Sequence, residues 1–466
     1  MTGSLPTRMK RLRTAVEGLD EVLCGGLFEG GVYIFEGPPG VGKTTLANQI
    51  AYTLARSDVR TLYVTMLAES HSRMLQHMEQ QVFFDHREVN AKVFYVSGYR
   101  ELEQSGLKGV VGLLRGELVR NRASLVVIDG LVVEGRVSAA DDSVRQFVHE
   151  LQSLVSAMSC TCLVLTSGNG NVLSAEQTMV DGIFSFEDHG FHWRAERRLQ
   201  VRKFRGSQIL RGQHTFCIST RGLQVFPRLE SLPTAADQGP AGADVVSSGI
   251  SALDAVLRAG GLLSGHASVV VGESGTGKTT VALAFAAEST QSSPGLMFCC
   301  TELSGDLKRM GSELGLKTGA SVEAGSLTIE TLGLEDESMD EMGHKLLRRV
   351  DELRARRLVV DGLAGLADTL AFPDRGYRFL GRLLAELKQR GVTSLFTVDP
   401  AALAVAAGTP LAGGVTGWFD NAFALEPNRG GDKRWLSVVK VRGGHLAQGA
   451  VDVQLRPRGA ALSPSA

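Results

Sequence analysis

The chain contains 466 residues, more than one ordinary domain holds, and this length predicts two to four domains. Hydrophobic residues make up 43% and charged residues 21%, a balance that supports a buried core and excludes a disordered chain. The 49 Lys and Arg residues nearly cancel the 50 Asp and Glu residues, so we expect neither a membrane nor nucleic acid as a partner.

The cysteines and the N-terminal residues indicate the compartment. Among the six cysteines there is no C-x-x-C pair, which argues against a zinc ribbon and a disulfide framework and favours a reducing environment. The basic residues of the first twenty positions are followed by Glu17 and Asp20 rather than by an apolar stretch, so no signal peptide is predicted. We therefore expect a cytoplasmic protein.

The first half of the chain predicts strands that alternate with helices. Short β-branched runs occur at residues 32–36, 62–65, 125–128 and 162–165. This order is typical of βαβ units around a parallel sheet that is buried on both faces. Strand-like runs joined by glycine-containing turns follow at residues 200–204, 215–218 and 223–226. They predict that the domain ends in an antiparallel flap.

The second half repeats this order in register. The lysines of two glycine-rich loops are 235 positions apart, two strand-end aspartates 232, and two K-x-R-G stretches 237. A near-constant offset indicates a tandem duplication. The flap is repeated at residues 435–441 and 450–455. The predicted organisation is α/β, with a first domain at 1–228, a linker at 229–244, a second domain at 245–458 and a tail at 459–466.

Both halves contain the phosphate-binding pattern G-x-x-x-x-G-K-[ST] between a predicted strand and a predicted helix. The glycines let backbone N–H groups surround phosphates, the lysine reaches the β and γ phosphates, and the Thr hydroxyl ligates Mg²⁺. A single match could be a chance glycine-rich turn, but two matches in register predict ATP binding with Mg²⁺. The candidate residues are Gly37, Gly40, Val41, Gly42, Lys43, Thr44 and Thr45, and Gly272, Gly275, Thr276, Gly277, Lys278, Thr279 and Thr280.

Carboxylates complete the predicted sites. Asp129 and Asp361 end apolar strands and, with Thr44 and Thr279, are the candidate Mg²⁺ ligands, although a strand-end Asp can also cap a turn. Hydrolysis further needs a group that orients or deprotonates the attacking water, at the end of the strand beside the glycine loop. Glu69 and Glu302 are predicted to occupy that place. The alternative for both is a carboxylate that stabilises a helix start.

Taken together, these features resemble the double-domain KaiC family of the RecA-like superfamily. The resemblance runs from Thr14 to about Leu455 and includes E-G-L-D at 17–20, G-I-S-A-L-D at 249–254 and G-G-L at 25–27 and 260–262. It implies two tandem RecA-like P-loop domains and a two-tiered homohexamer with ATP at each subunit interface. It also implies an ATPase that acts as a signalling or timing switch, with an unidentified protein partner.

The resemblance assigns a role to the K-x-R-G stretches. It implies that Lys203 and Arg205, and Lys440 and Arg442, reach the nucleotide of the neighbouring subunit. A cation in that place would neutralise charge on the transferred phosphoryl group. The alternative is a solvated basic face, since four arginines lie close by, at positions 194, 197, 198 and 202.

Two departures from the family pattern affect the expected activity. Adjacent Ser and Thr residues accept phosphate in the family's second domain, but the corresponding stretch here reads Thr416-Gly417, which argues against autophosphorylation. The family's paired glutamates are single residues here, Glu69 and Glu302, so the water-activating residue of each site stays open.

Two other function classes compete with the switch. A nucleic-acid-dependent ATPase could use the same fold, but the neutral charge and the lack of interleaved aromatic and basic residues disfavour it. A scaffold in which one tier binds ATP without turnover is the third interpretation. The histidines show no metal-binding spacing, so Mg²⁺ with nucleotide is the only metal that we expect.

Overall fold

The chain folds into two compact units, Met1–Leu232 and Pro233–Ala466. The computed structural model describes residues 9–66, 71–131, 140–167, 179–191, 194–233, 244–257, 259–300, 302–332, 337–363, 365, 375–400, 415–427, 433–442 and 450–454. Each unit is built on one large sheet, and a small two-stranded sheet accompanies each of them.

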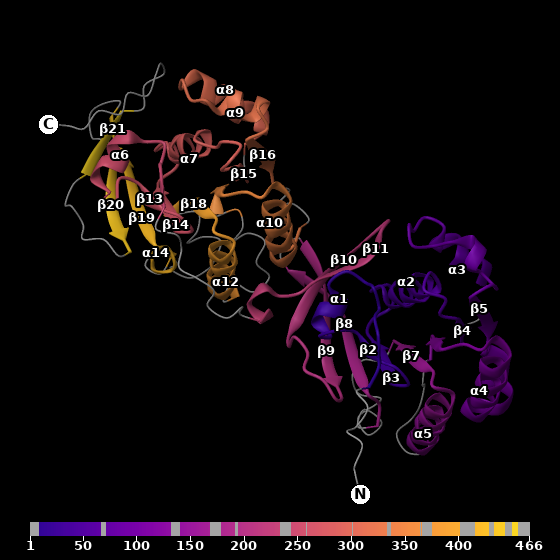
Figure 1. Ribbon diagram of the computed structural model, residues 1–466. Coiled ribbons are helices and arrows are strands. Elements are labelled where there is room, and N and C mark those ends of the chain that lie inside the picture. Colours follow the sequence, from indigo (N-terminus) through magenta and orange to yellow (C-terminus); the bar gives the residue numbers. More distant parts are fainter. Residues whose placement is uncertain are drawn as a thin grey trace, which may run out of the picture. The chain divides into compact units, whose positions relative to one another are not determined.

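The large sheet of the first unit has nine strands in the order β11-β10-β9-β8-β3-β7-β6-β4-β5 (Figure 1). Its parallel strands are β3 (Val32–Glu36), β4 (Thr61–Thr65), β5 (Val93–Ser97), β6 (Leu125–Asp129) and β7 (Thr161–Thr166). β8 (Gly182–Phe191) continues the parallel part beside β3, whereas β9 (Arg194–Phe204), β10 (Gln213–Ser219) and β11 (Gly222–Phe226) run antiparallel to their neighbours.

Helices cover both faces of this sheet. They are α2 (Lys43–Ala55), α3 (His71–Met78), α4 (Tyr99–Asn121) and α5 (Ala140–Met158). Because side chains alternate along a strand, Tyr33 of β3 packs in a core cluster with Ile50 of α2, and Ile34 packs in a second cluster with Leu114 of α4 and Leu151 of α5. The predicted doubly buried parallel sheet is therefore confirmed.

The second unit has an eight-stranded sheet in the order β16-β15-β17-β18-β14-β19-β20-β21. Its strands are β14 (Ala267–Gly272), β15 (Gly295–Cys299), β16 (Leu327–Thr331), β17 (Arg357–Asp361), β18 (Thr393–Val398), β19 (Asn421–Pro427), β20 (Lys433–Val441) and β21 (Ala450–Gln454). The pairing is parallel from β16 to β19 and antiparallel from β19 to β21. The repeated topology confirms the α/β class with two tandem domains of the same kind.

The remaining elements are short or lie outside the large sheets. The small sheets pair β1 (Arg11–Leu12) with β2 (Leu27–Phe28) and β12 (Val245–Val246) with β13 (Leu262–Leu263). The first unit also has α1 (Leu19–Val22) and the 3-10 turns at His86–Glu88 and Leu229–Ser231. The helices of the second unit are α6 (Ser251–Val256), α7 (Lys278–Ala287), α8 (Ser304–Glu313), α9 (Thr318–Glu323), α10 (Met339–Leu353), α12 (Gly376–Gln389) and α14 (Val415–Trp418).

The antiparallel part of the first unit is larger than the sequence predicts. β8 was not predicted, and β9 begins at Arg194, six residues before the predicted run at 200–204. The first half of β9 is rich in charge and lacks apolar alternation, so it carries no hydrophobic strand signal. In the register of β8 and β9, Arg198 lies opposite Glu187 and Arg197 opposite Asp188, and opposite charges in cross-strand positions favour such pairing.

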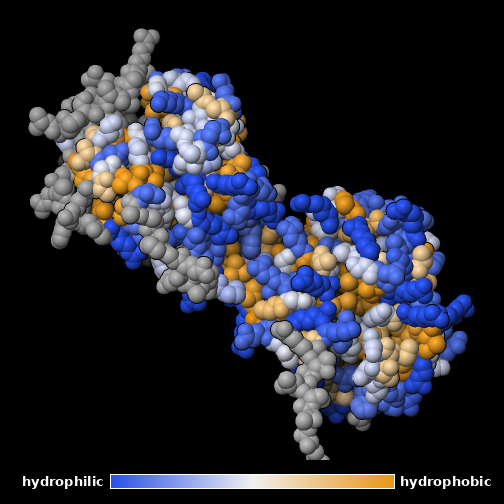
Figure 2. All heavy atoms as spheres, viewed as in Figure 1, coloured by the Kyte–Doolittle hydropathy of each residue, from blue (hydrophilic) through white to orange (hydrophobic). Residues whose placement is uncertain are grey.

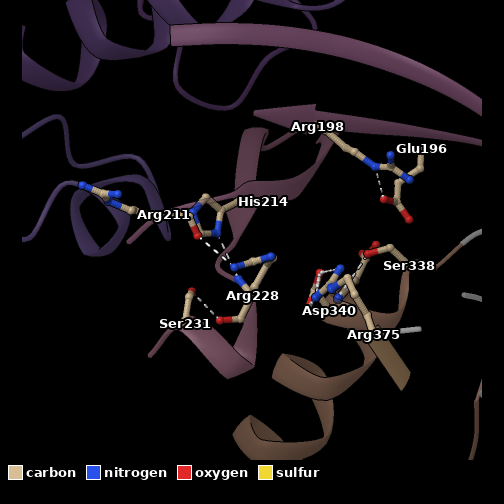
Figure 3. A network of polar contacts seen from close by, with 10 residues as sticks. Glu196, Arg198, Arg211, His214, Arg228, Ser231, Ser338, Asp340 and Arg375 are labelled. Atoms are coloured by element: carbon tan, nitrogen blue, oxygen red, sulfur yellow. Dashed lines mark hydrogen bonds and ion pairs between the residues drawn. The ribbon is translucent and has the colours of Figure 1, made fainter. Parts of the chain in front are cut away.

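A buried histidine fixes the end of the first unit (Figure 3). The His214 side chain is fully buried, its Nε2 lies 2.9 Å from the Leu210 carbonyl oxygen, and its Nδ1 accepts a hydrogen bond from the Arg228 N–H at 3.0 Å. The Ser231 hydroxyl donates to the Arg228 carbonyl at 2.7 Å. These bonds hold the chain that leads out of the unit.

Apolar side chains are scattered over the described surface. On the face in view in Figure 2, hydrophilic and hydrophobic residues are interspersed. Large exposed apolar side chains such as Val82, Val119 and Leu303 occur singly, as is normal for globular proteins. Among the helices of the described ranges, none is long and apolar enough to cross a bilayer.

Candidate nucleotide-binding sites

Both glycine-rich loops lie between a central strand and a helix, at residues 37–42 and 272–277. The first connects β3 to α2 and the second connects β14 to α7. Gly40 and Gly275 both have φ of 78°, a left-handed conformation that favours glycine. A Cβ added at either position would meet nothing within 4 Å, so the outer side of each turn is open. The first N–H groups of each helix have no partner within the helix, which makes these ends suitable for phosphate.

The loop lysines bond to their own loops. Lys43 Nζ donates to the carbonyl oxygens of Gly37 and Pro38 at 2.6 and 2.9 Å. Lys278 Nζ donates in the same way to Gly272 and Glu273 at 2.9 and 2.8 Å. Burial lowers the pKa of Lys43, although the charge of Asp129 opposes that effect. Each ammonium group is therefore held over the turn that it would share with a phosphate.

The aspartate of the first site receives two hydroxyl groups. Thr44 Oγ1 and the Tyr63 hydroxyl donate to the same oxygen, Asp129 Oδ2, at 2.9 and 2.7 Å. Burial raises the pKa of Asp129, while the Tyr63 and Thr44 hydroxyls and Lys43 lower it. Burial, and then the charge of Asp129, raise the pKa of Tyr63, so the phenol stays protonated as a donor. The two predicted magnesium ligands of this site are thus in direct contact.

The second site contains a defined cavity of about 540 Å³. Its wall includes Lys278 and Thr279 at the start of α7, Asp361 at the end of β17, and Glu302 after β15. Burial is the largest effect that raises the pKa of Glu302, followed by the neighbouring Asp361. The structure therefore brings together one predicted residue of each kind in this unit: the loop lysine, the threonine, the strand-end aspartate and the glutamate.

One premise about the glutamates is wrong. We expected them at the end of the strand beside the glycine loop, but β15 is separated from β14 by β17 and β18. Glu302 reaches the cavity because β15 is adjacent to β17, whose last residue is Asp361. In the first unit β4 likewise lies beside β6 and not beside β3. Glu69 itself lies outside the described residues.

A family profile for "ATPase: KaiC" matches residues 12–230 and 246–465, which is nearly all of both units. The chain belongs to the KaiC family of ATPases. The match occurs twice, once in each unit, in agreement with the repeated sheets and the repeated loops.

Curated KaiC proteins are similar over most of the chain. The circadian clock oscillator protein KaiC of Picosynechococcus sp. is 24% identical over 483 residues, 98% of this chain and 90% of that protein. Circadian clock oscillator protein KaiC 1 of Synechocystis sp. is 24% identical over 414 residues, 84% of this chain and 76% of that protein. Circadian clock protein KaiC2 of the same organism is 23% identical over 400 residues, 82% of this chain and 69% of that protein. This chain is a divergent relative of these KaiC proteins.

The second K-x-R-G stretch of this KaiC-family chain contacts residues of the same chain. Lys440 Nζ donates to the carbonyl oxygens of Thr416, Gly417 and Phe419 at 3.1, 3.1 and 2.8 Å, at the end of α14. Arg442 donates to Asp420 Oδ1 at 2.9 Å. The predicted contact with a neighbouring subunit's nucleotide stays a prediction, and it requires these side chains to exchange partners.

The corresponding cations of the first unit lie at the end of β9 or just after it. Lys203 belongs to β9, and Arg205 donates to the Met179 carbonyl oxygen at 3.0 Å. Burial lowers the pKa of Lys203, and the charge of Arg205 adds to that effect. Two cations are thus held close together on the edge that the family resemblance assigns to a neighbouring nucleotide.

Sequence reasoning missed Arg434 as a site residue. This arginine of β20 contributes to the wall of the cavity that contains Lys278. It precedes Lys440 by six positions, as Arg197 precedes Lys203. The shared offset of 237 could have singled out both arginines, but the charge-rich stretch around Arg197 was read as a solvated basic face.

Within the described ranges, no group of three His, Cys, Asp or Glu side chains could hold a metal ion by itself. The six cysteines, all of which are described, are free.

Proposed function

We propose that this protein binds ATP with Mg²⁺ in both units and hydrolyses it at the subunit interfaces of a two-tiered homohexamer. In this proposal the nucleotide state sets the conformation of the ring and its affinity for a protein partner in the cytoplasm. The observation that carries the proposal is the repeated site: in each unit a phosphate-binding loop and a strand-end aspartate stand at the same edge of the parallel sheet. The KaiC family match and the six free cysteines support it.

The residues of the first site suit Mg²⁺. A hydroxyl has one hydrogen and two lone pairs, and Thr44 uses its hydrogen on Asp129, which leaves its lone pairs for a cation. Mg²⁺ prefers such oxygen ligands and is usually held by one or two side chains together with phosphates. Thr44 with Asp129, and Thr279 with Asp361, would hold the ion. When bound, Mg²⁺ neutralises negative charge on the phosphates.

The lysines and Glu302 supply the chemistry of the chain itself. Lys43 and Lys278 would give up carbonyl oxygens for a phosphate, because a hydrogen bond between two charged groups is the stronger one. Glu302 in its ionised form would accept a proton from water as the water oxygen attacks the γ phosphorus and the bond to the β–γ bridging oxygen breaks. Its raised pKa makes it a stronger base than an exposed glutamate.

In each tier, cations from the neighbouring subunit would complete the nucleotide site. Lys203 and Arg205, and Lys440 and Arg442, would stabilise charge on the phosphoryl group of a neighbouring subunit, an effect of about a thousandfold or more in rate. The contacts of Lys440 with the Thr416–Phe419 stretch would then link ring assembly to the position of α14. With glycine at position 417 we do not propose transfer of phosphate to the protein.

Phosphate release measured on single-site variants tests this function. Lys43→Ala and Lys278→Ala should each lower turnover, and the double variant should abolish it. Glu302→Gln in the Lys43→Ala background should remove the remaining turnover without loss of nucleotide binding. Labelled ATP should leave no label on the polypeptide. Turnover that survives in the double variant would show that the two loops are not the hydrolytic sites, and stimulation by single-stranded DNA would favour a nucleic-acid-dependent ATPase.

A further inference from the structure

The aspartates of the two sites are held by different hydroxyl groups. In the first unit the Tyr63 hydroxyl donates to Asp129 Oδ2 at 2.7 Å, and it comes from β4 on one side of the aspartate's strand. In the second unit Thr397 Oγ1 donates to Asp361 Oδ1, and it comes from β18 on the other side. Both donors are fully buried.

The register of the strands shows that each unit has one donor and lacks the other. Tyr63 pairs with Val127, and at the same position of the second unit Met297 pairs with Val359. In β18 the partner of Val359 is Leu395, and Thr397 lies two residues further along the strand. The corresponding residue of β7 in the first unit is Leu165. Neither the methionine nor the leucine side chain can donate a hydrogen bond. The aspartate of each unit therefore receives a hydroxyl hydrogen bond, but the donor strand lies on opposite sides of the aspartate's strand in the two units.

A second hydrogen bond accompanies the bond between donor and aspartate in each unit. Asp129 Oδ2 accepts from Tyr63 and also from Thr44 in the first turn of α2, directly after the glycine-rich loop, so both hydroxyls bind the same atom. Thr397 Oγ1 also accepts a hydrogen bond from the Gly362 N–H at 2.8 Å, where the chain turns after β17 with φ of 94°. In both units a hydroxyl from a neighbouring strand restricts the rotation of the carboxylate.

We propose that Tyr63 and Thr397 are positioning residues that fix the orientation of the Mg²⁺-side carboxylate, Tyr63 in the first site and Thr397 in the second. The inference rests on the proposed function, since it concerns the same two sites. Partners that orient a metal ligand typically change metal affinity by about 10- to 100-fold when they are removed. Hydrogen bonds to a carboxylate are stronger where burial lowers the local dielectric constant.

A purely structural role makes a different prediction. Removing a buried hydroxyl lowers stability wherever it lies, since its partner loses a hydrogen bond. Tyr33 is the matched control in the first unit: it is fully buried on β3, and its hydroxyl bonds to the main chain of Phe28. Thr393 is the control in the second unit: it is buried on β18, and its hydroxyl accepts from the Gly265 N–H. Neither control hydroxyl contacts an aspartate in these bonds.

The experiment measures the Mg²⁺ dependence of nucleotide binding, one site at a time. The first site is studied in full-length Lys278→Ala protein with a fluorescent ADP derivative, with and without Mg²⁺. Tyr63→Phe should raise the Mg²⁺ concentration needed for half-maximal tightening of binding about tenfold, and leave the affinity without metal within about twofold. Tyr33→Phe should leave both quantities unchanged, even where its melting temperature falls as much.

The second site is studied in the Lys43→Ala protein. Thr397→Val should shift the Mg²⁺ dependence by about tenfold, Thr397→Ser should restore it, and Thr393→Val should have no effect. An unchanged Mg²⁺ dependence in Tyr63→Phe and Thr397→Val, or an equal shift in the controls, would overturn the positioning role alone. If the parent proteins bind the nucleotide without any response to Mg²⁺, both this role and the proposed function are wrong.

Discussion

Replacing Arg375 by methionine should destabilise the second unit strongly, because it removes an ion-pair partner of the buried Asp340 carboxylate. Arg375 precedes α12, and Asp340 lies in the first turn of α10 (Figure 3). The guanidinium donates to Asp340 Oδ1 at 3.0 Å and to Oδ2 at 3.2 Å. The Asp340 side chain is 1% exposed and the Arg375 side chain 17%. The pair joins the two helices.

The expected size follows from this burial. Removing one partner of a buried ion pair costs about 3 to 5 kcal/mol, because the remaining charge stays buried without the attraction that offsets its desolvation. In a unit of this length each kcal/mol lowers the melting temperature by about 2 to 4 °C, so Arg375→Met should lower it by roughly 6 to 20 °C. Replacing Asp340 by leucine in the same protein should recover most of the loss, since no charge then stays buried.

Fluorescence isolates the second unit in this test. Two of the three tryptophans, Trp418 and Trp435, belong to it, and a Trp193→Phe background removes the third. Arg309→Met is the control: its pair with Asp306 is largely exposed, at 71% and 54%, and its loss should cost less than about 1 kcal/mol. A destabilisation by Arg375→Met no larger than that of the control would refute the reasoning.

Three further predictions concern other buried polar groups. His214→Leu removes the bonds to Leu210 and Arg228 and should cost the first unit about 2 to 4 kcal/mol by urea denaturation; a loss under 1 kcal/mol would contradict it. Glu36 bonds to Ser185 and Arg202. Arg202→Met removes the cation beside the buried carboxylate and should therefore cost more than Glu36→Val in the same assay; the reverse order would contradict this. Burial raises the pKa of Asp420, but the Ala267 N–H, Arg442, His266 and Lys388 outweigh it and lower the pKa below the ordinary value. Asp420 therefore adds stability above pH 4 that is lost as pH falls through its lowered pKa, and Asp420→Asn should flatten this acid limb in the second unit; an unchanged limb would contradict it.

The sequence predicts the parallel part of each sheet because burial on both faces requires continuous apolar strands. β3, β4, β6 and β7 coincide closely with β-branched runs, and each glycine-rich loop follows such a run. The first half of β9 could not be predicted in this way. Its strand is specified by pairing with β8, a contact between residues whose charges read as a solvated surface.

Only the site residues that belong to sequence motifs could be predicted. Loop residues and strand-end aspartates have fixed spacing, so the repeat identifies them. Tyr63 and Thr397 act through strands that pair with the aspartate's strand, and a pairing between distant segments is not visible in one sequence. The same reason explains the wrong premise about the strand before Glu302: pairing in the sheet, not order in the chain, decides which strand ends lie side by side.

Native mass spectrometry in Mg²⁺ and ATP tests most directly whether both units hold nucleotide in a ring of identical chains. We predict a particle of six chains of 49.8 kDa each that carries two nucleotides per chain. The count should fall to one per chain in Lys43→Ala and in Lys278→Ala. A single chain without bound nucleotide at saturating ATP would contradict the account.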